Sequence, residues 1–265
     1  MAVAEGGAGK PQIEGRLSRM EKRWTHVHGL RLFARTWERR GAPELVLVHG
    51  LAVSGRYFVP LAEELAPFAS VAAPDLPGFG RSTKPRRTLT VAELALALAA
   101  WLEHNGLERP VLVANSLGCQ FAVELVVRAP ERVGGLVLIG PALEPRTRSR
   151  LRWVLRWTAT AFLERPPLHL VVARDALRAG PARVWATFED ALRDPLDGEL
   201  ARVAAPTLVL RGEHDPIAPQ EACERMAAAL PNGRLAVVPG AGHALNWSRP
   251  RDAARAIRAW LEEAE

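Results

Sequence analysis

The sequence alternates short, continuous apolar runs with longer segments in which apolar residues recur at helical spacing. Continuous apolar runs bounded by turn residues are typical of strands that are buried on both faces of a sheet. Such strands between amphipathic helices predict an α/β fold with a mainly parallel sheet flanked by helices. The predicted buried strands are 44–50, 70–75, 110–114, 134–140, 205–212 and 234–240.

The clearest helix follows Thr90. Thr90 and Glu93 have the spacing of a capping box, and the apolar residues from Val91 to Leu102 fall on one helical face. Further predicted helices are 117–129, about 219–230 and a final helix that carries Ala253, Ile257, Trp260 and Leu261 on one face.

Residues 1–22 are rich in glycine, alanine and charge, so we expect a flexible N-terminal tail. Residues 23–37 are then predicted to form two short strands that turn at His28 and Gly29. The tail lacks the uninterrupted apolar stretch of a secretory signal, and no later run is long enough to span a bilayer. These features predict a cytoplasmic protein without stable membrane insertion.

Residues 142–203 break the alternation, because they are helical in pattern and contain no strand-like run. This insertion falls between two core strands. Its base must therefore lie at the carboxyl edge of the sheet, where open α/β folds bind ligands. We expect an α/β core of residues 23–141 and 204–265, with 142–203 as a helical lid.

Charge and composition narrow the possible partners. Lys10, Lys22 and Lys84 are the only lysines among 35 basic residues, so the net charge of +6 comes mainly from arginines. That bias is as typical of a genomic codon preference as of binding, and no zinc, RNA-recognition or helix-turn-helix pattern accompanies it. We expect a small-molecule substrate, no nucleic-acid partner, no metal and no organic cofactor. Cys119 and Cys223 are expected to be free thiols.

Ser116 stands between a predicted strand and a predicted helix, in the segment Ala114-Asn115-Ser116-Leu117-Gly118. A serine on such a sharp turn projects its hydroxyl above the sheet, and the turn needs small residues two positions to either side. Gly118 is one of them, and Ala114 stands where glycine is more usual. The alternative is a serine at a helix N-cap without a chemical role.

A serine nucleophile needs a general base, and the base needs a third group that fixes its tautomer. Asp215 and His243 each follow a predicted strand, so both should reach the same sheet edge as Ser116. Ser, Asp, His is one of the chain orders in which such triads occur. Taken singly, Asp215 before Pro216 is also an ordinary turn residue, and His243 an ordinary loop histidine. Their combination predicts a catalytic triad.

Other residues compete for these roles less well. The remaining histidines lie in the initial strands, at a helix end, in the lid or beside the acid: His26, His28, His104, His169 and His214. Glu144, after strand 134–140, is an alternative acid.

The tetrahedral intermediate of acyl transfer requires preorganised hydrogen-bond donors, usually two backbone N–H groups. One should come from Leu117, at a helix N-terminus. The other should come from the loop after strand 44–50, from Leu51 or alternatively Ala52, with His49 and Gly50 shaping the loop.

Four motifs together resemble the α/β-hydrolase superfamily, in its serine hydrolase branch with the esterases. They are HGLAVSG (49–55), DLPGFGRS (75–82), ANSLGC (114–119) and GAGHALNW (240–247). The likeness covers residues 23–263 apart from the lid. It implies a cofactor-independent hydrolase that forms an acyl-enzyme on Ser116 with ordinary esters, and structural roles for Asp75 and Gly78.

Two alternatives remain open within this resemblance. Asn115 and Trp247 are similar to positions in carbon–carbon hydrolases of meta-cleavage products, although Leu117 and Cys119 replace the Met and Gly of those enzymes, and their Gly-Pro oxyanion segment is missing. A non-catalytic, ligand-binding relative is the other alternative.

The lid sequence predicts the kind of pocket. Its aromatic residues, among them Trp153 and Trp157, are interleaved with arginines. A basic amphipathic helix of this kind could touch a membrane, but packing over the pocket accounts for the same residues. We therefore expect an apolar pocket for an acyl or aromatic ester, with Asn115, Trp247, Trp153 and Trp157 as candidate lining residues.

Overall fold

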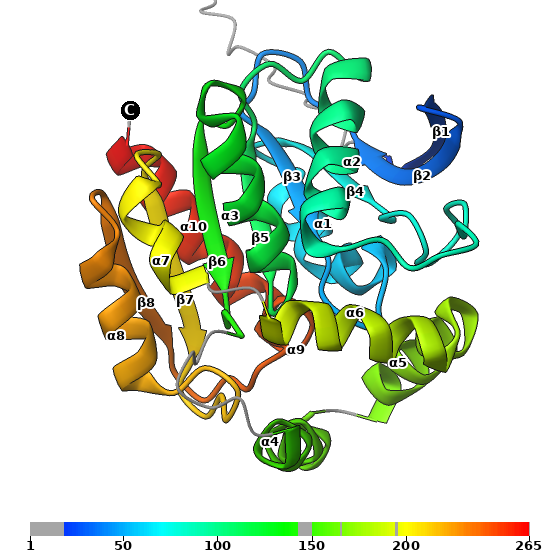
Figure 1. Ribbon diagram of the computed structural model, residues 1–265. Coiled ribbons are helices and arrows are strands. Elements are labelled where there is room, and N and C mark those ends of the chain that lie inside the picture. The colour runs from blue at the N-terminus through cyan, green and yellow to red at the C-terminus, as the bar shows by residue number, and fades with distance from the viewer. Residues whose placement is uncertain (1–18, 143–149, 165, 194–195, 265) are drawn as a thin grey trace, which may run out of the picture.

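An eight-stranded sheet forms the centre of the computed structural model, which describes residues 19–142, 150–164, 166–193 and 196–264 (Figure 1). The strand order is β1-β2-β4-β3-β5-β6-β7-β8. β1 and β2 form an antiparallel hairpin, β2 pairs antiparallel with β4, and the remaining pairs are parallel. The predicted fold class is thereby confirmed. The strands are β1 (Glu21–Val27), β2 (Leu30–Trp37), β3 (Glu44–Val48), β4 (Ser70–Pro74), β5 (Val111–Asn115), β6 (Gly135–Ile139), β7 (Thr207–Gly212) and β8 (Gly233–Val238).

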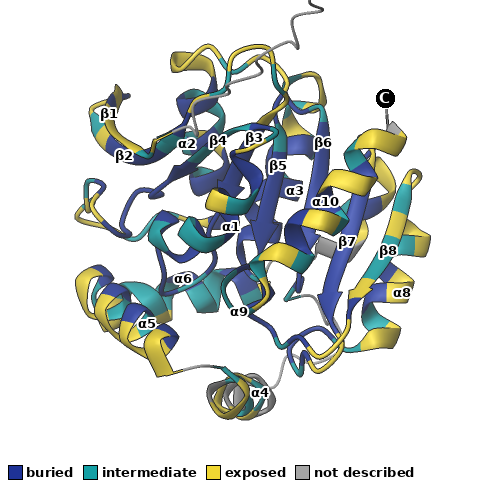
Figure 2. Ribbon diagram, turned by 180° about the vertical axis from the view of Figure 1, so that it is seen from behind, coloured by how far each residue is buried: buried dark blue, intermediate teal, exposed yellow. Residues whose placement is uncertain are grey.

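Helices cover both faces of the sheet, and Figure 2 shows the buried strands between them. α1 (Val59–Leu65) and α10 (Pro250–Ala264) pack on one face in a core cluster that includes Phe58 and Ile257. α2 (Val91–His104), α3 (Gly118–Arg128) and α8 (Gln220–Ala229) pack on the other, in a cluster that includes Trp101 and Phe121. Because both faces are covered, β3, β5 and β6 consist of almost entirely buried, apolar residues, which is the pattern seen in the sequence.

Local sequence signals account for element boundaries in several places. The Thr90 hydroxyl accepts from the Glu93 N–H at 3.2 Å, and the Glu93 carboxylate accepts from the Thr90 N–H at 3.0 Å, so the predicted capping box is confirmed.

At the N-terminal end, β1 begins at Glu21, two residues before the expected first ordered residue. Glu21 and Lys22 are exposed but pair with Thr36 and Arg35. Backbone pairing extends the strand where hydropathy gives no signal. Residues 1–18 of the expected tail lie outside the described residues.

Within the described residues, four α-helices stand between β6 and β7. We call α4 (Arg150–Leu163), α5 (Pro166–Ala179), α6 (Pro181–Arg193) and α7 (Leu196–Glu199) the helical insertion. Three of them, α4, α5 and α6, lie at the carboxyl end of the parallel strands (Figure 1). Polar contacts attach it to the core: the Ser54 hydroxyl donates to Asp175 at 2.6 Å, and the Val91 N–H donates to Asp190 at 2.7 Å. None of the described helices has the length and apolarity that a membrane crossing requires.

Candidate active site

Ser116 occupies a tight turn between β5 and α3. Its φ of +56° lies in the left-handed region, which is costly for a residue with a side chain. A hydrogen bond to the neighbouring strand β6 fixes the turn, because the Ser116 N–H donates to the Ile139 carbonyl at 2.9 Å. A Cβ on Gly118 would lie 2.4 Å from the Val48 carbonyl oxygen, so the turn requires glycine there, whereas Ala114 is accommodated fully buried. The local fold therefore places the Ser116 side chain at the carboxyl edge of the sheet.

Asp215 and His243 meet at the same edge, from the loops after β7 and β8. His243 Nδ1 lies 2.8 Å from Asp215 Oδ2. The other Asp215 oxygen accepts from the backbone N–H groups of Ile217 at 2.8 Å and Ala218 at 3.1 Å. With Asp215 ionised, Nδ1 carries the donated proton and leaves Nε2 as the free acceptor of the neutral ring.

Burial and charge act in opposite directions on this pair. Burial on its own raises the pKa of Asp215, but the charge of His243 and the hydrogen bonds from His243, Ala218 and Ile217 outweigh it and hold the pKa below its ordinary value. Burial lowers the pKa of His243, but the charge and hydrogen bond of Asp215, with a further contribution from Glu164, hold it above its ordinary value. The pair therefore favours a carboxylate beside a basic imidazole.

Gly140 fits directly against this pair and was not singled out from the sequence. Its φ is +52°, and a Cβ there would lie 2.7 Å from Asp215 Oδ2 and 2.9 Å from His243 Nδ1. A side chain at position 140 would displace one partner or the other. The available signal was a glycine at the end of strand 134–140, on the edge where the other polar residues were expected.

The loop after β3 passes over the Ser116 turn. A Cβ on Gly50 would lie 2.9 Å from the Asn115 carbonyl oxygen and 3.4 Å from the Leu117 nitrogen. This close approach brings Leu51 beside Leu117, and both line one cavity. Among the described residues, neither the Leu51 nor the Leu117 N–H donates to a backbone carbonyl. Two unengaged donors therefore lie next to Ser116.

His49 fixes the conformation of this loop. Its Nδ1 lies 2.9 Å from the Gly50 carbonyl, and its Nε2 accepts from the Leu76 N–H at 2.9 Å. Complete burial lowers the pKa of His49, so the ring is neutral and its two nitrogens act as one donor and one acceptor. His49 is thus a structural residue of the loop.

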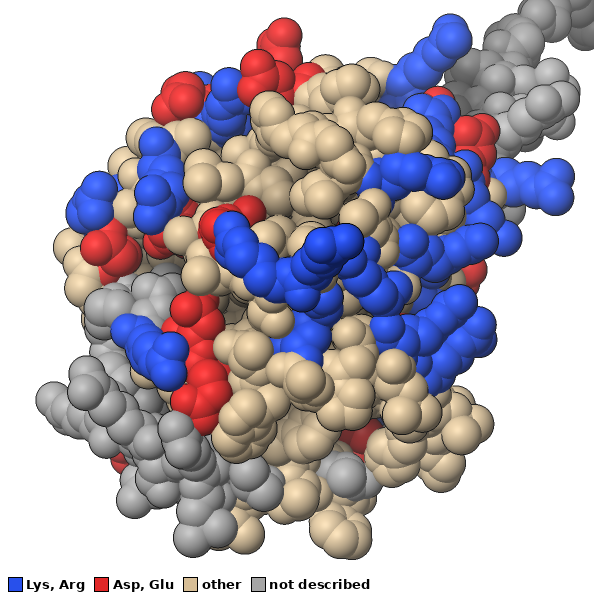
Figure 3. Space-filling view, turned by 45° about the vertical axis from the view of Figure 1, so that its right-hand side comes forward, with Lys and Arg blue, Asp and Glu red and all other residues tan. Residues whose placement is uncertain are grey.

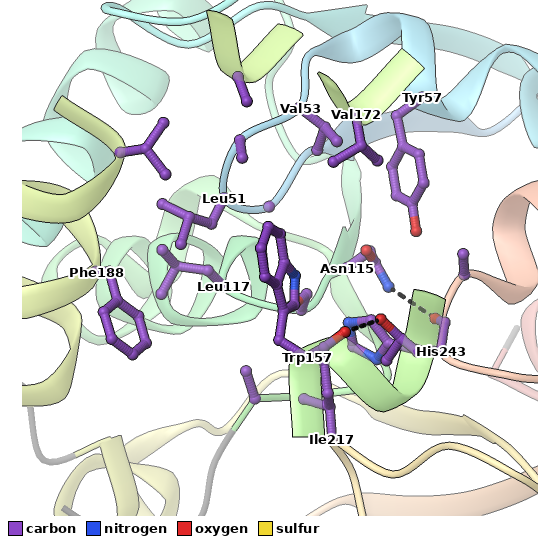
Figure 4. Close-up of a pocket in the computed structure, with 18 of the residues that line it drawn as sticks. Leu51, Val53, Tyr57, Asn115, Leu117, Trp157, Val172, Phe188, Ile217 and His243 are labelled. Atoms are coloured by element: carbon purple, nitrogen blue, oxygen red, sulfur yellow. Dashed lines mark hydrogen bonds between the residues drawn. The ribbon is translucent and has the colours of Figure 1, made fainter. Parts of the chain in front are cut away.

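A cavity of about 510 Å³ opens above Ser116 and His243, and its lining is mainly apolar. In the view of Figure 4, Trp157 stands in the middle of the pocket, with Leu51, Leu117 and Phe188 to one side of it and Asn115 and His243 to the other. The core supplies one side of this apolar pocket, and α4, α5 and α6 of the helical insertion supply the other. A volume of this size suits a small organic ligand.

The four expected pocket residues have different outcomes. Asn115 and Trp157 line the apolar pocket. The Asn115 amide donates to the Ile139 carbonyl at 3.1 Å and to the His243 carbonyl at 3.5 Å, so it also ties the serine turn to the histidine loop. The side chain of Trp153 lies outside the described residues.

The expectation that Trp247 lines the pocket was wrong. Its ring stacks on Tyr57 with centroids 6.5 Å apart and planes 7° apart, and Tyr57 lines the pocket in its place. α9 (Leu245–Ser248) begins two residues after His243 and turns Trp247 toward the core cluster under α1. Trp247 therefore packs against Tyr57, the residue that lines the pocket, and does not line it itself.

Glu164, at the end of α4, is a residue that sequence reasoning missed. One carboxylate oxygen accepts from the Ala244 N–H at 2.8 Å, and the other is buried without a hydrogen-bond partner within the described part of the chain. A Cβ on Gly242 would lie 2.7 Å from this carboxylate, which gives the second glycine of the G-x-G-H segment a reason. Glu164 thus joins the helical insertion to the loop that carries His243. No sequence signal placed this residue, because the lid helices have no predictable position.

The structure describes the competing histidines but not the alternative acid. His214 is exposed and lies 3.9 Å from Glu213, while Glu144 lies outside the described residues. Within the described residues, no group of three or more His, Cys, Asp or Glu side chains is arranged to hold a metal. Cys119 and Cys223 are free and buried, as predicted.

Comparison with known proteins gives consistent matches. The model of the Alpha/beta hydrolase family matches residues 45–256. A putative carbamate hydrolase RutD of Pseudomonas syringae is 30% identical, with 83% of this chain and 94% of the relative covered. A pimeloyl-[acyl-carrier protein] methyl ester esterase of Xanthomonas campestris is 30% identical, with 76% and 88% covered. The structure of a thermophilic esterase from Thermogutta terrifontis is similar with a TM-score of 0.76 at 26% identity, covering 92% of this chain and 99% of that one.

Proposed function

Because the chain belongs to the α/β-hydrolase family, we propose that it is a serine hydrolase that cleaves esters of apolar acyl or aromatic small molecules. Ser116 is the nucleophile, His243 the base and Asp215 the acid of this proposal. The observation that carries it is the 2.8 Å contact between His243 Nδ1 and Asp215 Oδ2, in a cavity that Ser116 and His243 both line. Relatives named as esterases and a hydrolase support hydrolysis as the class of reaction.

Acylation follows from the roles assigned to these groups. His243 Nε2 takes the hydroxyl proton of Ser116 as the serine oxygen attacks the ester carbonyl carbon. The N–H groups of Leu51 and Leu117 donate to the resulting oxyanion, and the N-terminal end of α3 adds its dipole. When the tetrahedral intermediate collapses, the bond to the alcohol oxygen breaks and that oxygen takes the proton from His243. The acyl group stays on Ser116.

Deacylation repeats these steps with water. His243 removes a proton from the water as its oxygen attacks the acyl carbon, and the same two N–H groups hold the second oxyanion. Collapse breaks the bond to the Ser116 oxygen, which takes the proton back from His243. Asp215 remains ionised throughout and stabilises the imidazolium that forms twice in each cycle.

The lining of the apolar pocket supports an ester with an apolar acyl or aromatic group. Leu51, Val172, Phe188 and Ile217 surround the space, so apolar surface of the substrate would be removed from water on binding. The carbon–carbon hydrolase alternative rested on Asn115 and Trp247. Asn115 is engaged with two backbone carbonyls, and Trp247 stacks behind Tyr57. Neither observation adds to that alternative.

A fluorophosphonate probe tests the nucleophile. We expect wild-type protein to be labelled and Ser116→Ala to lose labelling, while Ser248→Ala, which lies outside the pocket lining, labels normally. Folded wild-type protein that remains unlabelled would support a non-catalytic relative and overturn the proposal.

A substrate panel tests the bond that is cleaved. Initial rates with p-nitrophenyl butyrate and octanoate are compared with those for a vinylogous 1,5-diketone. We expect turnover of the esters that depends on Ser116. Turnover of the diketone alone would replace ester hydrolysis by carbon–carbon hydrolysis.

A further inference from the structure

A second cavity, of about 430 Å³, lies on the opposite side of α5 from the apolar pocket. α5 turns Leu168, Val172 and Ala176 toward the apolar pocket, and Arg174, Asp175 and Arg178 toward the second cavity. Of the eleven residues that line the second cavity, six are basic and one is acidic. We call this cavity the basic cleft. Its basic residues are Lys22, Arg35, Arg56, Arg81, Arg174 and Arg178.

These residues come from five separate parts of the chain: β1, β2, the segment after β3, the loop after β4, and α5. Figure 3 shows Lys and Arg side chains gathered on the face that carries these elements, with few acidic side chains among them. Several exposed arginines elsewhere pair with acids, as Arg225 does with Glu221 and Arg258 with Glu262.

The acidic groups of the basic cleft are already engaged. Asp75, fully buried beneath it, accepts from Arg35 at 3.0 Å and from the N–H groups of Gly55 and Arg81 at 2.9 and 2.8 Å. Asp175 accepts from the Ser54 hydroxyl at 2.6 Å. These contacts give the cleft a fixed floor.

The rim carries positive charge that is not neutralised. In the described part of the chain, Lys22, Arg56, Arg174 and Arg178 form no ion pair. A concave site lined by charges of one sign focuses the potential and attracts counter-ions of the other sign. Guanidinium groups match the oxygens of phosphate in a bidentate geometry, so several arginines around one hollow fit a phosphate group particularly well.

We propose that the basic cleft binds a small, multiply charged phosphate compound, at a site separate from the apolar pocket. The charge of the rim calls for more than one negative charge on the ligand. The enclosed volume suits a small molecule, whereas a nucleic acid requires a basic stripe along an extended surface.

Occupation of the basic cleft would connect the helical insertion with the core. The ligand would lie between α5 and the hairpin of β1 and β2, next to Ser54 and Arg56. Val53 and Tyr57, the neighbours of those two residues, line the apolar pocket. A ligand that binds only the folded protein also raises its melting temperature by mass action.

Isothermal titration calorimetry with pyrophosphate and with inorganic phosphate, at constant ionic strength set with sodium chloride, tests the proposal. We expect saturable binding that is tighter for pyrophosphate. Arg174→Gln combined with Arg178→Gln should weaken pyrophosphate binding at least about tenfold, because two charge-assisted contacts are lost. The matched control combines Arg251→Gln with Arg255→Gln, which have the same spacing on α10 and side chains that are 84% and 79% exposed. It should bind like wild type.

Melting curves give a second readout that does not depend on activity. Pyrophosphate should raise the melting temperature of wild type and of the control, and that of the Arg174 and Arg178 double variant by less at the same concentration. Absence of saturable binding, or an equal loss in the control, would overturn the proposal. Binding to phosphatidylglycerol vesicles without binding to pyrophosphate would overturn it in favour of a membrane-facing surface. None of these outcomes depends on whether Ser116 is a nucleophile.

Discussion

The two sides of the apolar pocket are built differently. On the core side, Asp215 and His243 are buried, and hydrogen bonds fix His243 Nδ1 and both oxygens of Asp215. On the side of the helical insertion, the lining residues Trp157 and Leu177 are 51% and 74% exposed. The core thus holds Asp215 and His243 in one geometry, whereas the insertion presents apolar surface with fewer constraints. In our proposal, the chemistry belongs to the first side and the choice of substrate to the second.

The difference has a physical cause. Parallel strands end together at one edge, so residues that follow β5, β7 and β8 are brought within reach of one another by the sheet itself. The helical insertion has no such frame and depends on individual polar contacts, such as those of Asp175 with Ser54 and Asp190 with Val91. Substitutions on the two sides should therefore change different kinetic constants.

The largest expected effect is that of Asp215→Asn on the core side. The amide can donate to Nδ1 and stabilise the tautomer in which Nε2 carries the proton, so the base is lost while the shape is kept. We expect kcat for p-nitrophenyl butyrate to fall about 10⁴-fold. Asp252→Asn, at an exposed carboxylate of α10, is the control and should keep wild-type kcat. An Asp215→Asn variant within tenfold of wild type would remove Asp215 from the acid role.

A smaller but still large effect is expected from Gly140→Ala, which tests how tightly the core side fixes the pair. The added Cβ would lie 2.7 Å from Asp215 Oδ2, so the contact between Asp215 and His243 must open. A misplacement of about 1 Å in a catalytic group costs on the order of 100-fold in kcat. Gly106→Ala is a matched control, because Gly106 also has a positive φ, +68°, but nothing lies within 4 Å of its Cβ. Both variants carry a similar backbone cost in stability, and only Gly140→Ala should lose activity.

The same contrast decides what could be predicted from the sequence. The strands, the capping box at Thr90 and the convergence of Asp215 and His243 at one edge follow from apolar patterning and sheet topology. The position of Trp247 could not be predicted, because it depends on the path of the short helix α9. The role of Glu164 could not be predicted either. Its contact with Ala244 joins residues 80 positions apart in the sequence, and no regular sequence pattern fixes the position of the helical insertion. The catalytic roles of Ser116, Asp215 and His243 themselves stay predictions.

On the insertion side, Trp157→Ala should act on substrate binding. The half-exposed indole lines the apolar pocket, so its removal takes away contact area without touching the pair. We expect kcat/KM for p-nitrophenyl octanoate to fall about tenfold, mainly through KM, with a smaller change for the butyrate. Trp24→Ala, at a 41% exposed tryptophan of β1 outside the pocket lining, is the control. A loss confined to kcat would break the division between the two sides.

The smallest effect concerns Glu164 of the helical insertion, which contacts the loop that carries His243. Its carboxylate helps to hold the pKa of His243 above the ordinary value. The base must be neutral to accept a proton, so kcat/KM should rise as pH increases through this pKa. Glu164→Gln removes the negative charge but keeps an oxygen that can accept from the Ala244 N–H. The pKa of His243 should then fall, and the acid limb of the pH profile should move to lower pH, with a plateau within about threefold of wild type.

Two further variants separate charge from position at Glu164. Glu164→Ala removes the charge and the acceptor together, so its acid limb should move in the same direction while its plateau falls below that of Glu164→Gln. Glu213→Gln is the control, because Glu213 also accepts from a backbone N–H, that of Gly240 at 2.8 Å, but is not among the groups that shift the pKa of His243. Its limb should stay in place. An unchanged acid limb in Glu164→Gln would limit the role of the helical insertion to substrate selection. The expected shift would show that the insertion also changes the pKa of the base. The reason is that salt and water screen a buried charge near the imidazole only weakly.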